Sequence, residues 1–188
     1  MRAAGPLGLR LRAPRSLLVI VDVQERLVPA VADAERVLRG CEALLRAARR
    51  LGVPALLTEH CPQQLGPLLP ALRGLGAADS VLAKTHFSAA DEPAVAQRVA
   101  AANRPQIVIA GMEAHVCVLQ TALGLRQAGY AVKWVADAIG SRHAHNRVAA
   151  TERARGLGAD IVTTEMVIFE WLGTSEHPKF RRLSGLIR

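Results

Sequence analysis

Six short apolar runs divide the chain, and each is followed at once by polar residues or glycine. The runs are rich in Val, Ile, Leu and Ala, without a regular alternation of apolar and polar positions. Such runs are typical of strands that are buried on both faces of a parallel sheet. The predicted strands are 16–21, 53–58, 81–83, 107–110, 131–136 and 160–163.

The segments between these runs show the spacing of amphipathic helices. Between 33 and 50, apolar residues recur every three or four positions, and Cys41 is one of them, so we expect Cys41 in the core. Gly129 and Thr164 are the expected caps of two later helices. Residues 62–76, with three prolines and three glycines, are expected to form a loop. The predicted helices are 33–50, 91–103, 117–129, 146–157 and 164–171.

Strand and helix alternate six times, which predicts an α/β fold. We expect a three-layer α/β/α architecture around a doubly wound, six-stranded parallel sheet of strand order 3-2-1-4-5-6. The 188 residues suffice for one hydrophobic core and contain no internal repeat or linker, so residues 16–188 are predicted to form a single domain. Residues 1–15 are basic and contain Gly and Pro, and are predicted to form a flexible N-terminal arm.

Composition and charge limit the classes of function. With 51% apolar and 21% charged residues the sequence is typical of a globular protein. No apolar run approaches the roughly 20 residues that cross a bilayer. The net charge of +8 is compatible with nucleic-acid binding, but the arginines are dispersed and only 3% of the residues are aromatic. We therefore expect a small-molecule substrate, and neither nucleic acid nor membrane as a partner.

The cysteines and glycines narrow the choice of cofactor. Three cysteines at unrelated spacings do not form a disulfide framework, which predicts a reducing compartment and a cytoplasmic location. The sequence has no CxxC pair for structural zinc, and no GxGxxG motif after the first apolar run for a dinucleotide. We expect no cofactor.

Three residues capable of chemistry follow apolar runs: Asp22 the first, Lys84 the third and Cys117 the fourth. Ligands of open α/β sheets bind at the carboxyl ends of the strands, next to the point where the strand order reverses. A carboxylate, an ammonium group and a thiol that meet there suit nucleophilic catalysis. The start of the helix after 107–110 is expected to lower the pKa of Cys117 and favour the thiolate.

Each of these residues also has a purely structural interpretation. Asp22 can cap a helix, Lys84 can extend into solvent, and Cys117 can be a buried structural cysteine. The Glu-His-Cys cluster at 59–61 raises the alternative of a metal site, although no histidine pair at helical spacing accompanies it. Asp137, after the fifth run, is interpreted as a turn carboxylate.

Three motifs together resemble the isochorismatase-like cysteine hydrolase superfamily. They are DVQ from Asp22, KTHFSA from Lys84 and GMEAHVCVLQTALGLRQAGY from Gly111. The segments TEHCPQQLGPLLPAL, TTEMVIFEWLG and HPKF are most similar to the subgroup of isochorismatase domain-containing proteins. The resemblance covers nearly all of the chain after the predicted arm, and it implies an isochorismatase-like fold.

The resemblance also implies a site. Asp22, Lys84 and Cys117 would form a catalytic triad. A non-proline cis peptide would lie at Met112–Glu113, and the backbone N–H groups of Glu113 and Cys117 would form an oxyanion hole. The substrate pocket is expected to include the four residues Gln24, His86, Phe87 and Met112.

The implied activity is hydrolysis of a small amide-like C–N bond through a thioester. Nicotinamidases of this superfamily carry an Asp/His metal site where this chain has the segment 58–60 (Thr-Glu-His), so no metal is expected. Isochorismatases cleave a vinyl ether without a cysteine, and the presence of Cys117 favours acyl chemistry. Ether hydrolysis and a non-catalytic binding or regulatory protein are the alternatives. Family members form oligomers, which predicts a homo-dimer or tetramer with the helix around 168–171 as a contact.

Overall fold

The structure, a computed structural model, describes residues 10–187. Six parallel strands form one sheet in the order β3-β2-β1-β4-β5-β6, which confirms the predicted fold class and strand order. The strands are β1 (Ser16–Val21), β2 (Ala55–His60), β3 (Val81–Lys84), β4 (Gln106–Met112), β5 (Ala131–Gly140) and β6 (Asp160–Val162).

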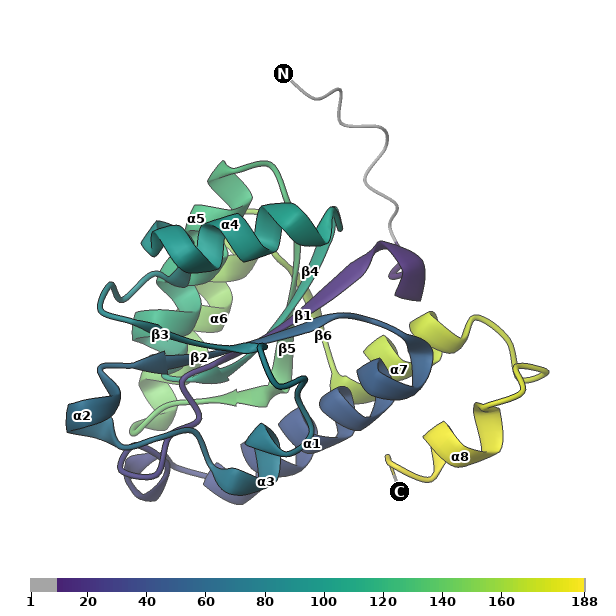
Figure 1. The fold of residues 1–188 in the computed structure, drawn as a ribbon, viewed down its shortest axis with the longest axis horizontal. Coiled ribbons are helices and arrows are strands. Elements are labelled where there is room, and N and C mark those ends of the chain that lie inside the picture. The colour runs from purple at the N-terminus through teal and green to yellow at the C-terminus, as the bar shows by residue number, and fades with distance from the viewer. Residues whose placement is uncertain (1–9, 188) are drawn as a thin grey trace.

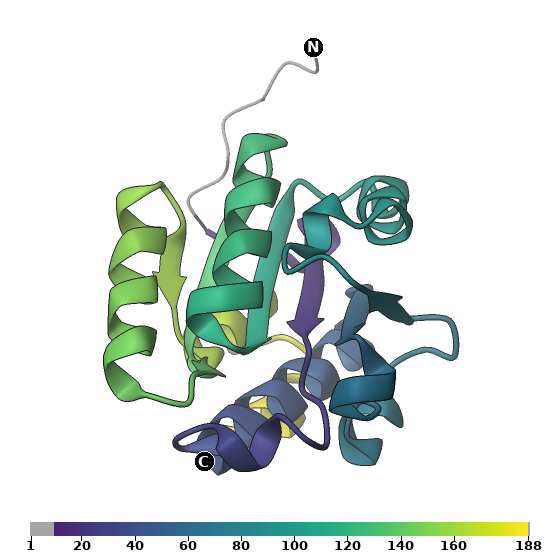
Figure 2. The ribbon, with the colours of Figure 1, turned by 90° about the vertical axis from the view of Figure 1, so that its left-hand side faces the viewer.

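Helices cover both faces of the sheet (Figures 1 and 2). One layer contains α1 (Ala34–Leu51), α3 (Pro70–Arg73), α7 (Thr164–Leu172) and α8 (Phe180–Ser184). The other contains α4 (Pro93–Ala102), α5 (Leu119–Gln127) and α6 (Ala144–Gly156). Short elements complete the fold: η1 (Ala13–Arg15), η2 (Val28–Ala30), α2 (Pro62–Leu65), η3 (Ala89–Asp91) and the π-helical turn η4 (Ala114–Val118).

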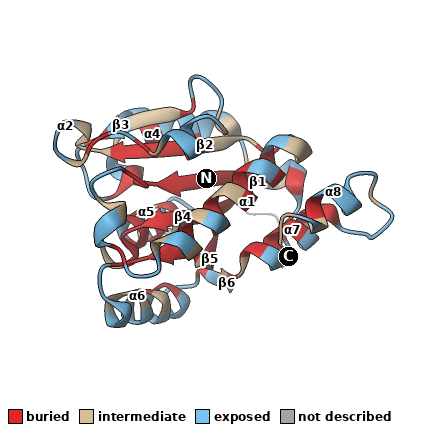
Figure 3. Ribbon diagram, turned by 90° about the horizontal axis from the view of Figure 1, so that it is seen from below, coloured by how far each residue is buried: buried red, intermediate tan, exposed pale blue. Residues whose placement is uncertain are grey.

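The core lies on both faces of the central strands (Figure 3). Every residue of β1 and β4 is buried, whereas the edge strands β3 and β6 are partly exposed. Two-sided burial is why these runs are continuously apolar.

Some boundaries differ from the predicted ones. Residues 62–76 contain the short helices α2 and α3 and are not a plain loop. The cap of α7 is Thr163, whose hydroxyl accepts a hydrogen bond from the backbone N–H of Met166, and not Thr164. Thr164 instead donates its backbone N–H to Asp137 Oδ1 at 2.8 Å. Asp137 therefore has the structural role that the sequence suggested, within the longer strand β5.

The last residues of the predicted N-terminal arm pack on the domain. Leu11 is buried, and the side-chain amide of Gln106 binds the backbone on both sides of it. Its Oε1 accepts from the N–H of Arg12, and its Nε2 donates to the carbonyl of Arg10, each at 3.0 Å. Residues 10–15 are thus part of the fold, and residues 1–9 of the arm lie outside the described residues.

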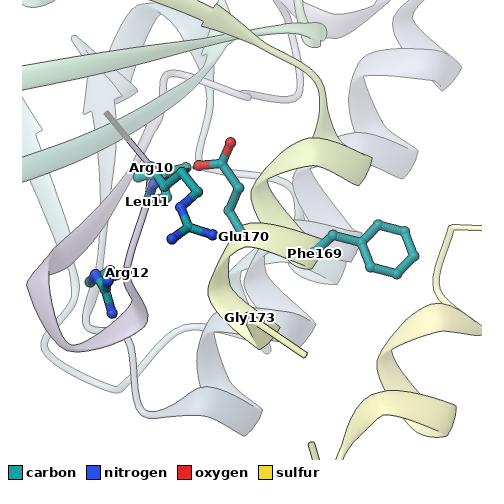
Figure 4. Close-up of a pocket in the computed structure, with 6 residues that line it drawn as sticks. All are labelled: Arg10, Leu11, Arg12, Phe169, Glu170 and Gly173. Carbon is teal, nitrogen blue, oxygen red and sulfur yellow. Dashed lines mark hydrogen bonds between the residues drawn. The ribbon is translucent and has the colours of Figure 1, made fainter. Parts of the chain in front are cut away.

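A hollow of about 300 Å³ lies beside these residues, on the side where β1 begins (Figure 4). It is lined by Arg10, Leu11, Arg12, Phe169, Glu170 and Gly173.

The apolar residues Ile168 and Trp171 of α7 point into the core, and Trp171 Nε1 donates to Ser16 Oγ at 2.9 Å. These two side chains cannot form the predicted oligomer contact, because they are already buried within the chain.

Within residues 10–187, no helix is both long and apolar enough to cross a membrane.

Candidate active site

Three strand ends bring Asp22, Lys84 and Cys117 together. Asp22 follows β1 directly, Lys84 is the last residue of β3, and Cys117 lies in η4, which follows β4. In the sheet β1 has β2 and β4 as neighbours, and β3 lies beyond β2. The Lys84 side chain therefore crosses the end of β2 to reach Asp22.

The centre of the site is a fully buried ion pair. Lys84 Nζ lies 2.7 Å from Asp22 Oδ2, and neither side chain is exposed to solvent. Thr58 Oγ1 donates to the other carboxylate oxygen, Oδ1, at 2.6 Å. The ammonium group also donates to the carbonyls of His86 and Phe87 at 3.1 and 3.3 Å. These contacts offset the large desolvation cost of burying two charges.

The two oxygens of the Asp22 carboxylate differ in their hydrogen bonding. Oδ2 is close to the ammonium group of Lys84, yet among the described residues no donor meets it with hydrogen-bond geometry. The contact between Asp22 and Lys84 is therefore an ion pair without a well-directed N–H···O bond. Oδ2 keeps a lone pair that can accept a proton.

The approach of β4 to β1 depends on a glycine. Gly111 pairs with Val21 and has φ +120°, and a Cβ at this position would lie 2.1 Å from the carbonyl oxygen of Val21. No side chain fits there. Asp22, which follows Val21 at the end of β1, has φ +51°, which is uncommon for a residue other than glycine. Both positions bring the ends of the two central strands close together.

The thiol of Cys117 is buried, with 7% of the residue exposed. Its pKa is raised to about 12, first by burial and then by the negative charge of Asp22, while the positive charge of Lys84 acts in the opposite direction. Interactions of the thiol with both side chains contribute to this pKa. The predicted lowering of the pKa is therefore wrong, because desolvation of the thiolate is the largest effect.

The turn that carries Cys117 is fixed by the segment after β5. The buried carboxylate of Glu113 accepts from the backbone N–H of Arg142 at 2.8 Å and from its Nε at 3.2 Å. The ring of His115 interacts with Ser141 Oγ at 3.1 Å and with Asn146 Nδ2 at 3.3 Å. The side chain of Glu113 is therefore used to hold the turn.

The backbone of the same turn contains one feature that the resemblance implies. The Met112–Glu113 peptide bond is cis. The carbonyl of Glu113 accepts from the N–H groups of Val116 and Val118, both at 3.2 Å, and the N–H of Cys117 lies between these two donors.

The four predicted pocket residues have different surroundings. Met112 is fully buried in the core and does not line an accessible pocket. Gln24 is also fully buried, and both ends of its amide bind backbone groups of His60 and Gly66, so it holds a loop. His86 directs Nδ1 toward Glu92 Oε2 at 3.1 Å. Phe87 is 53% exposed.

The acidic residue of the cluster at 59–61 is held by protein groups. Glu59 is buried, accepts the backbone N–H of Leu68 at 2.7 Å and forms an ion pair with Arg73. In the described part of the chain no three His, Cys, Asp or Glu side chains are grouped to hold a metal ion.

Sequence reasoning did not assign Thr58 to the Asp22 carboxylate or Arg142 to the Glu113 carboxylate. It also did not place His60 within reach of the charges of Asp22 and Lys84. Thr58 lies opposite Val21 in the register of β1 and β2, so its place at the end of the second run was a usable signal. Arg142 is brought to Glu113 by the path of the chain after β5, which no local pattern reveals.

A sequence model of the isochorismatase domain matches residues 16–166. The chain belongs to the isochorismatase family. Among curated relatives, isochorismatase domain-containing protein 2 of Homo sapiens is 37% identical over 191 residues, covering 100% of this chain and 90% of the relative. The Danio rerio protein of the same name is 33% identical over 178 residues, covering 95% of this chain and 89% of that relative.

Solved structures show the same isochorismatase-like hydrolase fold. The MAR1 ribonuclease of Caenorhabditis elegans aligns with a TM-score of 0.89 and 32% identity, over 95% of this chain and 92% of that one. YcaC of Escherichia coli, described as an octameric hydrolase of unknown specificity, has a TM-score of 0.86 and 26% identity, over 94% and 95%. YcaC of Pseudomonas aeruginosa, solved with hexane-2,5-diol and covalent acrylamide, aligns with a TM-score of 0.84 and 26% identity, over 96% of each chain.

Proposed function

We propose that this protein is a cysteine hydrolase that cleaves a small amide-like C–N bond. The observation that carries the proposal is the buried Asp22–Lys84 pair at 2.7 Å, with the Cys117 thiol interacting with both partners. Burying an ion pair is costly, and Lys84 Nζ, 2.7 Å from Asp22 Oδ2, meets that oxygen without hydrogen-bond geometry. An acid–base group beside a nucleophile accounts for both features.

In the first half of the reaction Asp22 acts as the base. With a pKa of about 12, Cys117 rests as a thiol, and Asp22 takes its proton as the sulfur attacks the substrate carbonyl carbon. Lys84 stabilises the negative charge that moves onto sulfur. The C=O π electrons move to oxygen, and the N–H groups of Glu113 and Cys117 bind the resulting oxyanion. One such donor is worth about 2.7–4 kcal/mol in other enzymes.

In the second half the proton held by Asp22 passes to the leaving nitrogen. The C–N bond breaks, the amine departs and a thioester to Cys117 remains. Water then attacks the thioester carbonyl and gives a proton to Asp22. The C–S bond breaks, the acid is released, and Asp22 returns the proton to the sulfur. Atoms and charges balance, and no cofactor is needed.

One relative supports a reactive group in this fold. The Pseudomonas aeruginosa YcaC structure contains covalent acrylamide. Acrylamide carries both an electrophilic carbon and a primary amide. We take this as support for a nucleophile that accepts small amides, and we assign that role in the present chain to Cys117.

A hydrolysis screen over small amides, ureides and nicotinamide tests the proposal. We expect turnover of at least one compound, loss of that turnover in Cys117→Ala, and a reduction of about 10²–10⁴-fold in Asp22→Asn. Cys61→Ser, which changes a cysteine outside the triad, is the matched control and should keep full activity. Turnover that survives Cys117→Ala would refute the assignment.

The same variants separate the alternatives. Activity on a vinyl ether such as isochorismate that is independent of Cys117 would support ether hydrolysis. A protein that binds compounds of the screen without converting any of them would support the binding or regulatory protein.

A nuclease is a second candidate, because the Caenorhabditis elegans relative is described as a ribonuclease and this chain has a net charge of +8. Degradation of RNA by the wild type, abolished by Asp22→Asn, would favour it. Binding to RNA that weakens steeply with salt, without cleavage, would show only electrostatic attraction.

We also propose that the protein is a homo-oligomer. On α7, Met166 and Phe169 are 45% and 39% exposed and lie three positions apart, hence on one face. The Escherichia coli relative is described as octameric. Light scattering coupled to size exclusion should give a dimer or larger species, and Phe169→Asp should shift it toward the monomer.

A further inference from the structure

His60 contacts the exposed ring of Phe87 and is affected by the charges of Lys84 and Asp22. It is the last residue of β2, and its ring centroid is 5.3 Å from that of Phe87, with 36° between the planes. The pKa of His60 is lowered by burial and by the charge of Lys84, while Asp22 acts in the opposite direction. The imidazole is therefore neutral near pH 7 and within electrostatic reach of both triad partners.

The position of His60 is built into the fold. Its backbone N–H donates to Gln24 Oε1 at 2.8 Å, and Gln24 Nε2 donates back to its carbonyl at 3.0 Å. Gln24 Nε2 also binds the carbonyl of Gly66 at 2.7 Å. A fully buried glutamine thus fixes the backbone from which the imidazole projects.

The two ring nitrogens of His60 have different surroundings. Nδ1 is buried and has no hydrogen-bond partner among residues 10–187. An interaction of the ring with the backbone of His86 acts to raise the pKa of His60. The His86 carbonyl also accepts a hydrogen bond from Lys84 Nζ at 3.1 Å. In the neutral tautomer whose hydrogen is on Nε2, Nδ1 carries a free lone pair.

We propose that His60 is a substrate-binding residue of the cysteine site, whose Nδ1 accepts an N–H of the substrate amide while the Phe87 ring packs on the substrate. The inference rests on the cysteine chemistry proposed above and adds the group that recognises the nitrogen side of the scissile bond. An enclosed acceptor without a donor is rare in folded proteins, and a ligand N–H would satisfy it. Phe87 is 53% exposed, so its ring is open to contact with a bound molecule.

The proposal selects for substrates with a hydrogen on nitrogen. Primary amides, ureides and secondary amides can donate to Nδ1, whereas tertiary amides, esters and nitriles cannot. A cationic group is disfavoured at the same place, because the positive charge of Lys84 acts on His60.

Alkylation of Cys117 tests this without knowledge of the natural substrate. The probes are acrylamide, which has two amide hydrogens, and acrylonitrile, which has none. For each, the second-order rate constant at Cys117 is divided by that of free glutathione, which removes intrinsic reactivity. We expect the acrylamide-to-acrylonitrile ratio to exceed one in the wild type and to fall about tenfold in His60→Leu.

Two further variants identify the nitrogen and guard against misfolding of His60→Leu. Asparagine places a polar atom near the position of Nδ1, and glutamine places one near Nε2. We expect His60→Asn to keep most of the amide preference and His60→Gln to lose it. Circular dichroism confirms that each variant is folded.

The outcomes separate the two proposals. If Cys117 reacts in the wild type but the ratio is the same in the wild type and all folded His60 variants, the role of His60 is refuted and the cysteine chemistry stands. If asparagine and glutamine variants behave alike, the assignment to Nδ1 is wrong. If wild-type Cys117 resists both reagents, the cysteine hydrolase itself is overturned, and the role of His60 with it.

Discussion

Cys41 and Cys117 have the same pKa shift and very different surroundings. Both thiols are buried, and the pKa of each is raised to about 12. A carboxylate and a cation act on each thiol: Asp137 and Arg36 on Cys41, and Asp22 and Lys84 on Cys117. Residue types and ionisation alone therefore do not distinguish the two sites.

Hydrogen bonding does distinguish them. Around Cys41, Asp137 Oδ1 accepts both the N–H and the hydroxyl of Thr164, and the guanidinium of Arg36 donates to backbone carbonyls of β5. Cys41 Sγ itself lies 3.6 Å from the carbonyl of Ala138.

Around Cys117, Asp22 Oδ2 lies 2.7 Å from Lys84 Nζ, but within residues 10–187 no donor meets it with hydrogen-bond geometry. The carboxylate near Cys41 holds another segment of the fold through a directed hydrogen bond, whereas the carboxylate near Cys117 keeps an oxygen that can accept a proton. A candidate nucleophile is better recognised by this difference than by its pKa.

The largest expected effect is on alkylation. In the native protein we expect acrylamide to modify Cys117 at least about 10³-fold faster than Cys41, because Cys41 reacts only from the unfolded state, which is a small fraction of the molecules. Peptide mass spectrometry over a time course measures both rates. The difference should disappear in 6 M guanidinium, and equal rates in the native protein would contradict the comparison.

Removal of the cation should disrupt the Cys117 site. Lys84→Met leaves the Asp22 carboxylate buried without a counter-charge, which we expect to lower the free energy of unfolding by about 3–5 kcal/mol. It should also slow alkylation of Cys117, because Lys84 is the charge that lowers the pKa of that thiol. Urea unfolding measures the first effect. The neutral double variant Asp22→Asn/Lys84→Met should recover part of the lost stability.

The raised pKa of Cys41 should affect only the free energy of unfolding of the protein. Cys41→Ser should cost about 1–3 kcal/mol at neutral pH, because it buries a hydroxyl. The unfolded thiol ionises near pH 9 and the folded one near 12. Above pH 9 the unfolded state binds fewer protons at Cys41 than the folded state, so the wild type loses stability through Cys41, and the serine variant lacks this loss. Unfolding at pH 8 and pH 10.5 should therefore give a smaller difference at the higher pH.

The smallest effect is expected at the turn that carries Cys117. Arg142→Ala should cost less than about 1 kcal/mol, because the guanidinium side chain is 55% exposed and the backbone N–H of residue 142 still binds Glu113. Arg98→Ala, which removes an exposed pair with Asp79, is the matched control. A loss above 2 kcal/mol only in Arg142→Ala would show that the turn depends on this ion pair.

The sequence predicted the sheet, and the meeting of Asp22, Lys84 and Cys117 at one edge of it, because both follow from local patterns. The buried strands are uninterrupted apolar runs. Asp22 and Lys84 directly follow the first and third runs, and Cys117 lies in the turn after the fourth. Alternating strands and helices then place the strand ends at one edge of a parallel sheet. The structure brings the three side chains together, while their catalytic roles remain a proposal.

Other features depended on packing that no local pattern encodes. The raised pKa of Cys117 follows from burial by segments distant in the sequence. The helix α7 is apolar on most sides. Its sequence therefore does not reveal that Ile168 faces the core while Phe169 faces outward. The packing of Leu11 depends on Gln106, whose amide reaches the chain before β1.

The glycine at position 111 has a consequence for how this site can vary. Gly111 has a hydrogen atom where any other residue has Cβ, and this lets the strand before Cys117 approach the strand before Asp22. Even a methyl group at position 111 would collide with the carbonyl of Val21. Substrate preference can therefore diverge through the surrounding loops, whereas the spacing of nucleophile and base leaves no room for gradual adjustment.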